Sequence, residues 1–396
     1  MPKFSRIIIA LSLLATFAKA EWITLPWPAI NATLPIWKPD DFNPDKSYPA
    51  IIWYGPAGDK PDATWIHKVT GGEHYVLLGM GYRQVPDEQF GENEIADALG
   101  LLKALKQTLT KSLSVDPKRI YVGGFSRGAK HSAILLDRDR DLAGGLICAT
   151  GSFEKRQVIL KFPQPKPIYI GCGRLDPNYP QALGAAVYFK QSGADATLEA
   201  WPDTKHQHPA TNPEGMRQWL LVQAKPLGLE QQASDWMNKR LGEIGEISNP
   251  VAQWLAYDAF IALPFVKTYG ANPSKIAKEN IDTLLKNPIV AKEEKWRGES
   301  RKILFRESQN RLLKTIQSAS VAHAAISERA AGTHAGKLAM HDLARTRDLI
   351  ENAKIVTRPA DPKPSSITPE LTPTAPTENP DRSPFLPPGI DVKPAD

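Results

Sequence analysis

The feature that most constrains the fold is an alternation of short apolar runs with helical patterns between residues 21 and 225. Each apolar run ends at a glycine or a turn, as do strands that are buried on both faces of a parallel sheet. The runs are Tyr48–Gly55, His74–Tyr82, Arg119–Gly124, Gly144–Gly151, Pro167–Gly173 and the more strictly alternating Ala196–Pro202. This order predicts an α/β fold with a mostly parallel sheet and right-handed crossover connections.

Two segments between the runs have helical periodicity. In the first, Asn93–Leu113, the residues Ile95, Leu99, Leu102, Leu105 and Leu109 fall on one face. The second follows Tyr179 and stops at Gly193, a residue type that commonly ends helices. Both segments are long enough to connect parallel strands.

The composition changes near Pro226. Residues 226–358 are charged and helical in pattern, with almost no strand-like runs, and we expect a helical hairpin or small bundle there. Residues 359–396 contain eleven prolines among Ser, Thr, Asp and Glu. Such a segment cannot bury a core, so the sequence predicts a disordered Pro-rich tail. The predicted domains are therefore an α/β domain at 21–225, a helical region at 226–358 and the tail.

The first twenty residues have the pattern of a secretory signal peptide. Lys3 and Arg6 precede the apolar run Ile7–Ala18, and Ala18-Lys19-Ala20 fits a small-x-small cleavage site. The sequence predicts cleavage after Ala20 and a secreted or periplasmic protein. An uncleaved N-terminal anchor is the alternative, although the apolar run is short for a membrane span.

Charge and cysteine content limit the class of protein further. Removing residues 1–20 removes three cations and no acid, so the formal charge falls from +6 to +3. This balance gives no nucleic-acid footprint, and no second apolar run of about 18 residues predicts a membrane span. Cys148 and Cys172 both lie in predicted buried strands. A disulfide and two buried thiols both remain open, since sequence cannot supply the Cα separation.

The segment "RIYVGGFSRGAKHSAIL" contains a Gly-x-Ser-x-Gly pattern around Ser126. The pattern alone is weak, but here a buried strand precedes it and a helix follows it. That context favours a strained turn that exposes the serine hydroxyl at the carboxyl edge of the sheet. The helix N-terminus then directs backbone N–H groups to the same place, and the first oxyanion donor is expected to be the N–H of Arg127.

A serine nucleophile needs a base and a group that orients the base. Asp176 follows one predicted strand, and His206 follows the next. The chain order Ser126, Asp176, His206 is the order expected for α/β-hydrolases. His208 also follows this strand and is the alternative base, although His206 is the one that we expect. A His-x-His metal pair is a further alternative, but no cluster of Asp, Glu or Cys lies near it in the sequence.

These residues resemble secreted esterases of the α/β-hydrolase superfamily, near the feruloyl-esterase, polyhydroxybutyrate-depolymerase and dienelactone-hydrolase-like branches. The resemblance spans about Tyr48 to His208. "VDPKRIYVGGFSRGA" looks like the nucleophile elbow of these enzymes, and "GRLDPNYPQALGAAVYFKQSGADATLEAWPDTKH" looks like their acid loop, helix and histidine loop. The resemblance implies the α/β-hydrolase fold and ester hydrolysis through an acyl-enzyme, with no cofactor. No metal is expected either, because no ligand cluster lies near the two histidines in the sequence.

One loop departs from the family pattern at two positions. Such enzymes commonly have His-Gly-x after the third strand, and the residue after the glycine donates the second oxyanion N–H. Here Tyr54 replaces the histidine and Pro56 stands at the donor position, and proline has no N–H. The second donor is therefore expected to be Ala57 or Gly58, or else the oxyanion hole is half-built.

The sequence is consistent with two functions. The first is a secreted serine hydrolase that cleaves a small-molecule or polymer-linked carboxylic ester, with a peptide or thioester as other possible substrates. The second is a catalytically degenerate α/β-hydrolase module for binding or scaffolding. In either case the helical region and tail are candidates for contact with a protein or the cell envelope.

Overall fold

The computed structural model describes residues 21–27, 32–39, 42–56, 60–82, 92–150, 162, 164–309 and 312–355. The predicted signal peptide and the predicted Pro-rich tail lie outside the described residues. The chain divides into two units, Met1–Ala353 and Lys354–Asp396, and the architecture below is that of the first unit.

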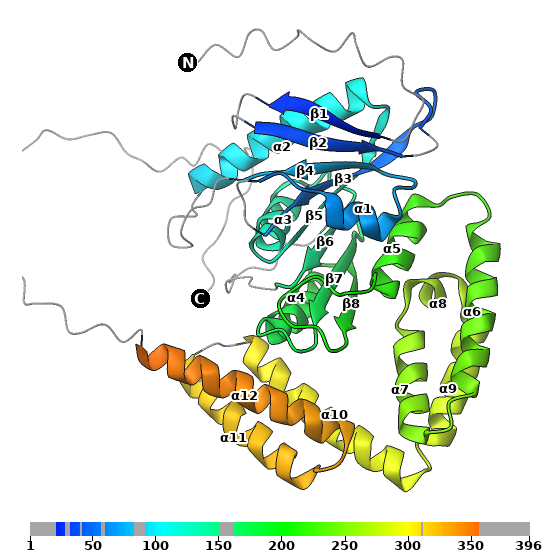
Figure 1. Cartoon of the computed structure of the whole chain (residues 1–396), viewed down its shortest axis with the longest axis vertical. Coiled ribbons are helices and arrows are strands. Elements are labelled where there is room, and N and C mark those ends of the chain that lie inside the picture. Colours follow the sequence, from blue (N-terminus) through cyan, green and yellow to red (C-terminus); the bar gives the residue numbers. More distant parts are fainter. Residues whose placement is uncertain are drawn as a thin grey trace, which may run out of the picture. The chain divides into compact units, whose positions relative to one another are not determined.

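The described strands form one eight-stranded sheet with the order β1-β2-β4-β3-β5-β6-β7-β8 (Figure 1). The strands are β1 (Glu21–Trp27), β2 (Ala32–Lys38), β3 (Tyr48–Tyr54), β4 (Val76–Met80), β5 (Val115–Phe125), β6 (Gly144–Cys148), β7 (Pro167–Gly173) and β8 (Asp195–Trp201). The pairs β1·β2 and β2·β4 are antiparallel, and the other neighbours are parallel. The mostly parallel α/β sheet expected from the sequence is confirmed.

Helices cover both faces of this sheet. The connecting helices are α1 (Thr64–Thr70), α2 (Glu92–Ser112), α3 (Arg127–Arg138), α4 (Tyr179–Gln191) and α5 (Glu214–Ala224). Apolar side chains of α2, α3 and α4 share one core cluster, and those of α1 and α5 share another. Side chains of β3 alternate between the two clusters, with Ile52 in the first and Ile51 in the second, as the two-residue period of a strand requires. Two covered faces explain why the central strands are continuously apolar.

Two observations about strands differ from the sequence expectation. The strands β1 and β2 are not expected from the sequence, because Pro26 and Pro35 interrupt their patterns and proline cannot donate to a ladder. β5 begins four residues before the expected Arg119, and Pro117 lies where the β3·β5 register shifts. That irregularity accommodates a proline inside a strand.

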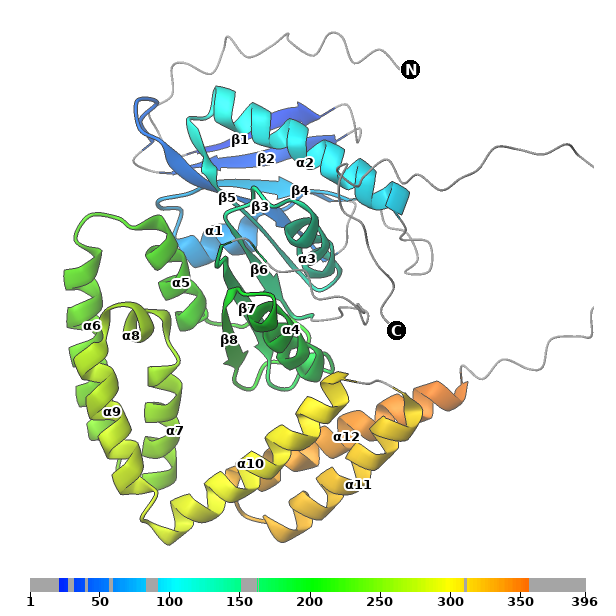
Figure 2. The same cartoon turned by 180° about the vertical axis from the view of Figure 1, so that it is seen from behind.

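From α6 onward the described chain is helical, as expected from its composition. The helices are α6 (Leu229–Gly245), α7 (Pro250–Ile261), α8 (Pro264–Tyr269), α9 (Ala271–Leu284), α10 (Pro288–Gln309), α11 (Leu313–Arg329) and α12 (His334–Ile355). α6–α9 share one apolar cluster, and α10–α12 pack on one another around a second, smaller cluster (Figure 2). Within the described part of the chain, no helix has both the length and the apolar character that crossing a membrane requires.

Candidate active site

Ser126 lies at the sharp turn between β5 and α3. Its φ is 56° and its ψ is −118°, a conformation that L-residues rarely adopt and that costs on the order of 1–3 kcal/mol. The turn closes only with glycine at two positions. A Cβ at Gly124 would lie 2.5 Å from the carbonyl carbon of Gly128, and a Cβ at Gly128 would collide with the carbonyl oxygen of Tyr54. The sequence pattern therefore has a steric cause, and it presents the Ser126 side chain at the carboxyl edge of the sheet.

The structure brings Ser126, His206 and Asp176 together. The Oγ of Ser126 lies 2.8 Å from Nε2 of His206, and Nδ1 of His206 lies 2.8 Å from Oδ2 of Asp176. The Asp176 side chain is fully buried, whereas that of His206 is 38% exposed. With Nδ1–H donating to the carboxylate, Nε2 is left as an acceptor for the serine hydroxyl. The three side chains form one hydrogen-bonded chain that runs from the interior to solvent.

Asn178 is a residue of this site that the sequence analysis missed. Its backbone N–H donates to Oδ1 of Asp176 at 2.8 Å, so the second carboxylate oxygen is also engaged. Its side-chain amide donates to the carbonyl oxygen of Ala149 at 3.2 Å and lies 3.5 Å from Nδ1 of His206. An aspartate that accepts from the N–H two residues later makes an Asx turn. The Asp-x-Asn spacing in the sequence is the signal that could have indicated it.

His208, the alternative base, lies in an aromatic cluster. Its ring stacks on Trp65 with centroids 4.3 Å apart and meets Phe125 edge-on at 4.2 Å. Burial lowers the pKa of His208 to about 4, and its Nε2 finds no hydrogen-bond partner among the described residues. Of the two histidines, only His206 contacts Ser126.

Of the two expected oxyanion donors, the structure describes only the first. Arg127 is the first residue of α3, where backbone N–H groups have no partner within the helix. Ala57 and Gly58 lie outside the described residues. Pro56 is described and exposed, and its carbonyl oxygen accepts a hydrogen bond from the hydroxyl of Tyr82 at 3.3 Å.

The structure also bears on the two cysteines and on a metal site. Cys148 and Cys172 are buried free thiols, and burial raises the pKa of both. Across the part of the chain that the structure describes, no group of three or more His, Cys, Asp or Glu side chains is arranged to hold a metal ion.

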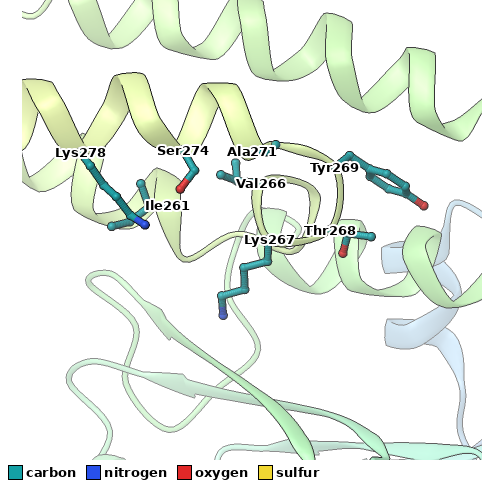
Figure 3. A pocket seen from close by; sticks show the side chains of 9 residues that line it. Ile261, Val266, Lys267, Thr268, Tyr269, Ala271, Ser274 and Lys278 are labelled. Carbon is teal, nitrogen blue, oxygen red and sulfur yellow. The ribbon is translucent and has the colours of Figure 1, made fainter.

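A cavity of about 480 Å³ lies away from Ser126, where α8 meets α9 (Figure 3). Lys267 reaches toward it from α8, and Ser274 and Lys278 do so from α9. Burial together with the nearby Lys190 lowers the pKa of Lys267. Neither Ser126 nor His206 lines this cavity.

Comparisons with known proteins place the chain in a broad context. No family model matches the chain. It is 25% identical over 181 residues to MhqD of Bacillus subtilis (strain 168), named as a presumed hydrolase, and the match covers 43% of this chain and 90% of MhqD.

Two solved structures are among those to which part of this chain is similar. One is a carboxylesterase of Bacillus cereus, with 17% identity, a TM-score of 0.41 and coverage of 48% of this chain and 93% of that chain. The other is a bacterial heroin esterase, with 17% identity, a TM-score of 0.39 and coverage of 54% and 86%. The strand order of the sheet and the strand–serine–helix turn at the end of β5 give this chain the α/β-hydrolase fold that its sequence predicts.

Proposed function

We propose that this chain is a serine hydrolase that cleaves a carboxylic ester through an acyl-enzyme. The observation that carries the proposal is the hydrogen-bonded chain of Asp176, His206 and Ser126, with 2.8 Å at both contacts. A serine hydroxyl gains nucleophilic strength only when a base takes its proton, and His206 is within the distance that this transfer needs. The strained backbone of Ser126 supports the same role, because such conformations cluster at functional sites.

The reaction follows from this geometry. The Oγ of Ser126 attacks the ester carbonyl while Nε2 of His206 takes the hydroxyl proton, and the buried Asp176 carboxylate stabilises the resulting imidazolium. His206 then donates that proton to the departing alkoxide, and an alcohol leaves. A water molecule, deprotonated by His206, attacks the acyl-serine, and the acid is released as Ser126 regains its proton.

The oxyanion that forms in each half-reaction needs donors. The backbone N–H of Arg127 supplies the first, at the N-terminus of α3, where the helix dipole also favours negative charge. The second donor comes from Ala57 or Gly58, because Pro56 has no N–H. Loss of one such donor slows acyl transfer by about a hundredfold or more, so the position of this second donor governs the rate.

The substrate class rests on the resemblance of the elbow and acid-loop segments to secreted esterases. We propose a small-molecule or polymer-linked ester as substrate, and export through the signal peptide at residues 1–20 with cleavage after Ala20. The N-terminal sequence of the protein recovered from an exporting host tests the cleavage. A mature chain that begins at Glu21 supports export, and an intact Met1 contradicts it.

Steady-state hydrolysis tests the reaction itself. The substrates are p-nitrophenyl esters of increasing acyl length, with a p-nitroanilide and a thioester of the same acyl group, each assayed with the wild type and with Ser126→Ala. We expect the esters to be cleaved fastest and the variant to lose the activity. Wild-type turnover no faster than that of Ser126→Ala on every substrate would overturn the proposal.

One observation favours a second candidate, a degenerate module that binds without catalysis. Pro56 occupies the position from which the family's second oxyanion donor comes. In that case the protein binds esters or acyl groups at Ser126 without turning them over. Binding of a non-hydrolysable phosphonate ester without any acyl-enzyme from a true ester would identify this candidate.

A further inference from the structure

We propose that Asp342, in the C-terminal helix α12, is a positioning residue for the turn that carries the catalytic acid, and that it acts through Arg174. This inference rests on the proposed hydrolase function. It makes the helical region part of the catalytic unit, although the region follows the sheet in sequence and contributes none of the three triad side chains.

The contact between the helix and the turn is a two-point ion pair. Nη2 of Arg174 donates to Oδ2 of Asp342 at 2.7 Å, and Nη1 donates to Oδ1 at 3.2 Å. The Arg174 side chain is 12% exposed and that of Asp342 is 1% exposed. A bidentate pair fixes orientation as well as distance, because the planar guanidinium and the carboxylate must lie in matching planes.

Arg174 stands two residues before Asp176, in the turn that follows β7. Its guanidinium lies over the ring of Tyr179 at 4.7 Å, and the backbone N–H of Tyr179 donates to the carbonyl oxygen of Asp176 at 3.0 Å. Arg174 therefore begins the short segment that carries Asp176, and its guanidinium contacts Tyr179 at the end of that segment. We expect a shift of the guanidinium to displace the segment at both ends.

Asp342 is itself held by a buried chain of charges. Nε of Arg345 lies 3.5 Å from Oδ1 of Asp342, and the guanidinium of Arg345 pairs with Glu307 of α10 at 2.7 Å. Nε2 of His323 in α11 lies 2.9 Å from Glu307. Burial acts to raise the pKa of Asp342, but the hydrogen bonds and charge of Arg174 outweigh it and hold that pKa below its usual value. The helices α10, α11 and α12 thus each contribute a side chain to the network that places the Asp342 carboxylate.

The consequence for catalysis is geometric. The Asp176 carboxylate orients His206, and a displacement of about 1 Å in a reacting group can cost about a hundredfold in rate. Loss of the Asp342 charge leaves Arg174 unpaired next to the acid turn, and a buried unpaired charge is driven toward water. We expect the turn to move with Arg174, which would worsen the hydrogen-bond geometry between Asp176 and His206.

The first test compares two Asp→Asn variants in the helical region of the full-length protein. Asp342→Asn is expected to lower kcat by about tenfold to a hundredfold with KM little changed, because the Asp176 carboxylate in this turn stabilises the transition state rather than the bound substrate. The control is Asp258→Asn, which breaks the 2.7 Å pair between α7 and Arg297 of α10. It leaves the Arg174 contact intact, so kcat is expected to match the wild type. Equal kcat values in the two variants would overturn the proposal.

A double variant separates positioning from folding stability. Arg174→Met with Asp342→Leu removes both charges and keeps apolar bulk, a replacement that is often neutral or stabilising. If Asp342 only stabilises the fold, the double variant regains both the melting temperature and kcat. We expect the melting temperature to recover while kcat stays at least about tenfold low. Recovery of both would contradict a positioning role.

A spectroscopic readout distinguishes failure of this inference from failure of the proposed function. The proton on Nδ1 of His206, when hydrogen bonded to a carboxylate, gives a far-downfield proton NMR resonance. We expect this resonance in the wild type and in Asp258→Asn, and its loss or upfield movement in Asp342→Asn and in the double variant. An unchanged resonance in all four proteins would overturn the inference even if no ester were cleaved. A wild type with the resonance but no ester turnover would instead count against the proposed function.

Discussion

Two chains of polar side chains lie in different regions of the molecule, and they differ in where they end. In the sheet region, Asp176, His206 and Ser126 form a chain that starts at a buried carboxylate and reaches a histidine that is 38% exposed. In the helical region, His323, Glu307, Arg345 and Asp342 form a chain that ends on Arg174, and none of its side chains is more than 12% exposed. The first chain is open to solvent and the second is closed.

This difference in exposure suits the two chains to different roles, the open chain to a reaction and the closed chain to holding the structure in place. In the open chain the Ser126 hydroxyl lies at the partly exposed end, where the proposed substrate would bind, and both contacts are within hydrogen-bond distance. In the closed chain each carboxylate is paired with a guanidinium or an imidazole, so the charges stabilise one another, and the Arg174 side chain at its end is only 12% exposed. Arg174 lies where the two chains approach, two residues before Asp176.

The largest expected effect is at the acid of the open chain. Asp176→Asn keeps the size of the side chain, but its amide presents an N–H toward Nδ1 of His206 and favours the wrong tautomer. We expect kcat for ester hydrolysis to fall by about 10⁴-fold with little loss of stability. Asp203→Asn is the control, because Asp203 is an exposed residue three positions before His206. A similar loss in both variants would remove the distinction between the two acids.

The next effect is on stability and concerns the closed chain. Glu307→Gln leaves Arg345 without its carboxylate in a buried site, and we expect the free energy of unfolding to fall by about 3–5 kcal/mol in urea titrations. Glu243→Gln changes an exposed pair with Arg240 and should leave stability unchanged. If the two variants unfolded at the same urea concentration, the closed chain would not be a stabilising network.

A smaller effect should appear at acid pH, through His131 behind the nucleophile elbow. Burial lowers the pKa of His131 to about 4 in the folded protein, against 6.5 for an ordinary histidine. The unfolded chain therefore binds the proton more tightly, and the free energy of unfolding should fall as pH drops from about 6.5 to 4. His131→Phe should flatten this fall by about 2–3 kcal/mol, whereas His334→Phe, at an exposed position, should not. Parallel curves for His131→Phe and the wild type would contradict the assignment.

The smallest effect is expected at the second histidine of the pair. His208→Phe preserves the stacking on Trp65 and removes a buried Nε2 that has no partner among the described residues. We expect kcat to change by less than about tenfold, because His208 makes no contact with Ser126. His206→Phe should abolish activity. The reverse result would move the base to His208.

Local patterns in the sequence predicted much of the sheet and the three residues of the open chain. The expected strand Pro167–Gly173 has the bounds of β7, and the glycines beside Ser126 have the steric purpose that the pattern implies. The choice between His206 and His208 depends on the path of the loop, since only one residue lies between them in the sequence. The strands β1 and β2 escaped because proline breaks their pattern.

The closed chain could not be found from the sequence in the same way. Arg174 and Asp342 are 168 residues apart, and Asp342 belongs to a helix rich in charged residues. Nothing in the local periodicity of α12 distinguishes Asp342 from an exposed aspartate. These charges are brought together by the packing of α10, α11 and α12 on one another and by the contact of Asp342 in α12 with Arg174 in the turn after β7.

The most direct test of the open chain is labelling of the purified protein with a fluorophosphonate probe, which reacts with activated serines. The proposed function predicts one covalent adduct, located by mass spectrometry on Ser126 and absent from Ser126→Ala and His206→Ala. A well-folded wild type that takes up no probe, or an adduct that persists in Ser126→Ala, would contradict the claim that Ser126 is an activated nucleophile.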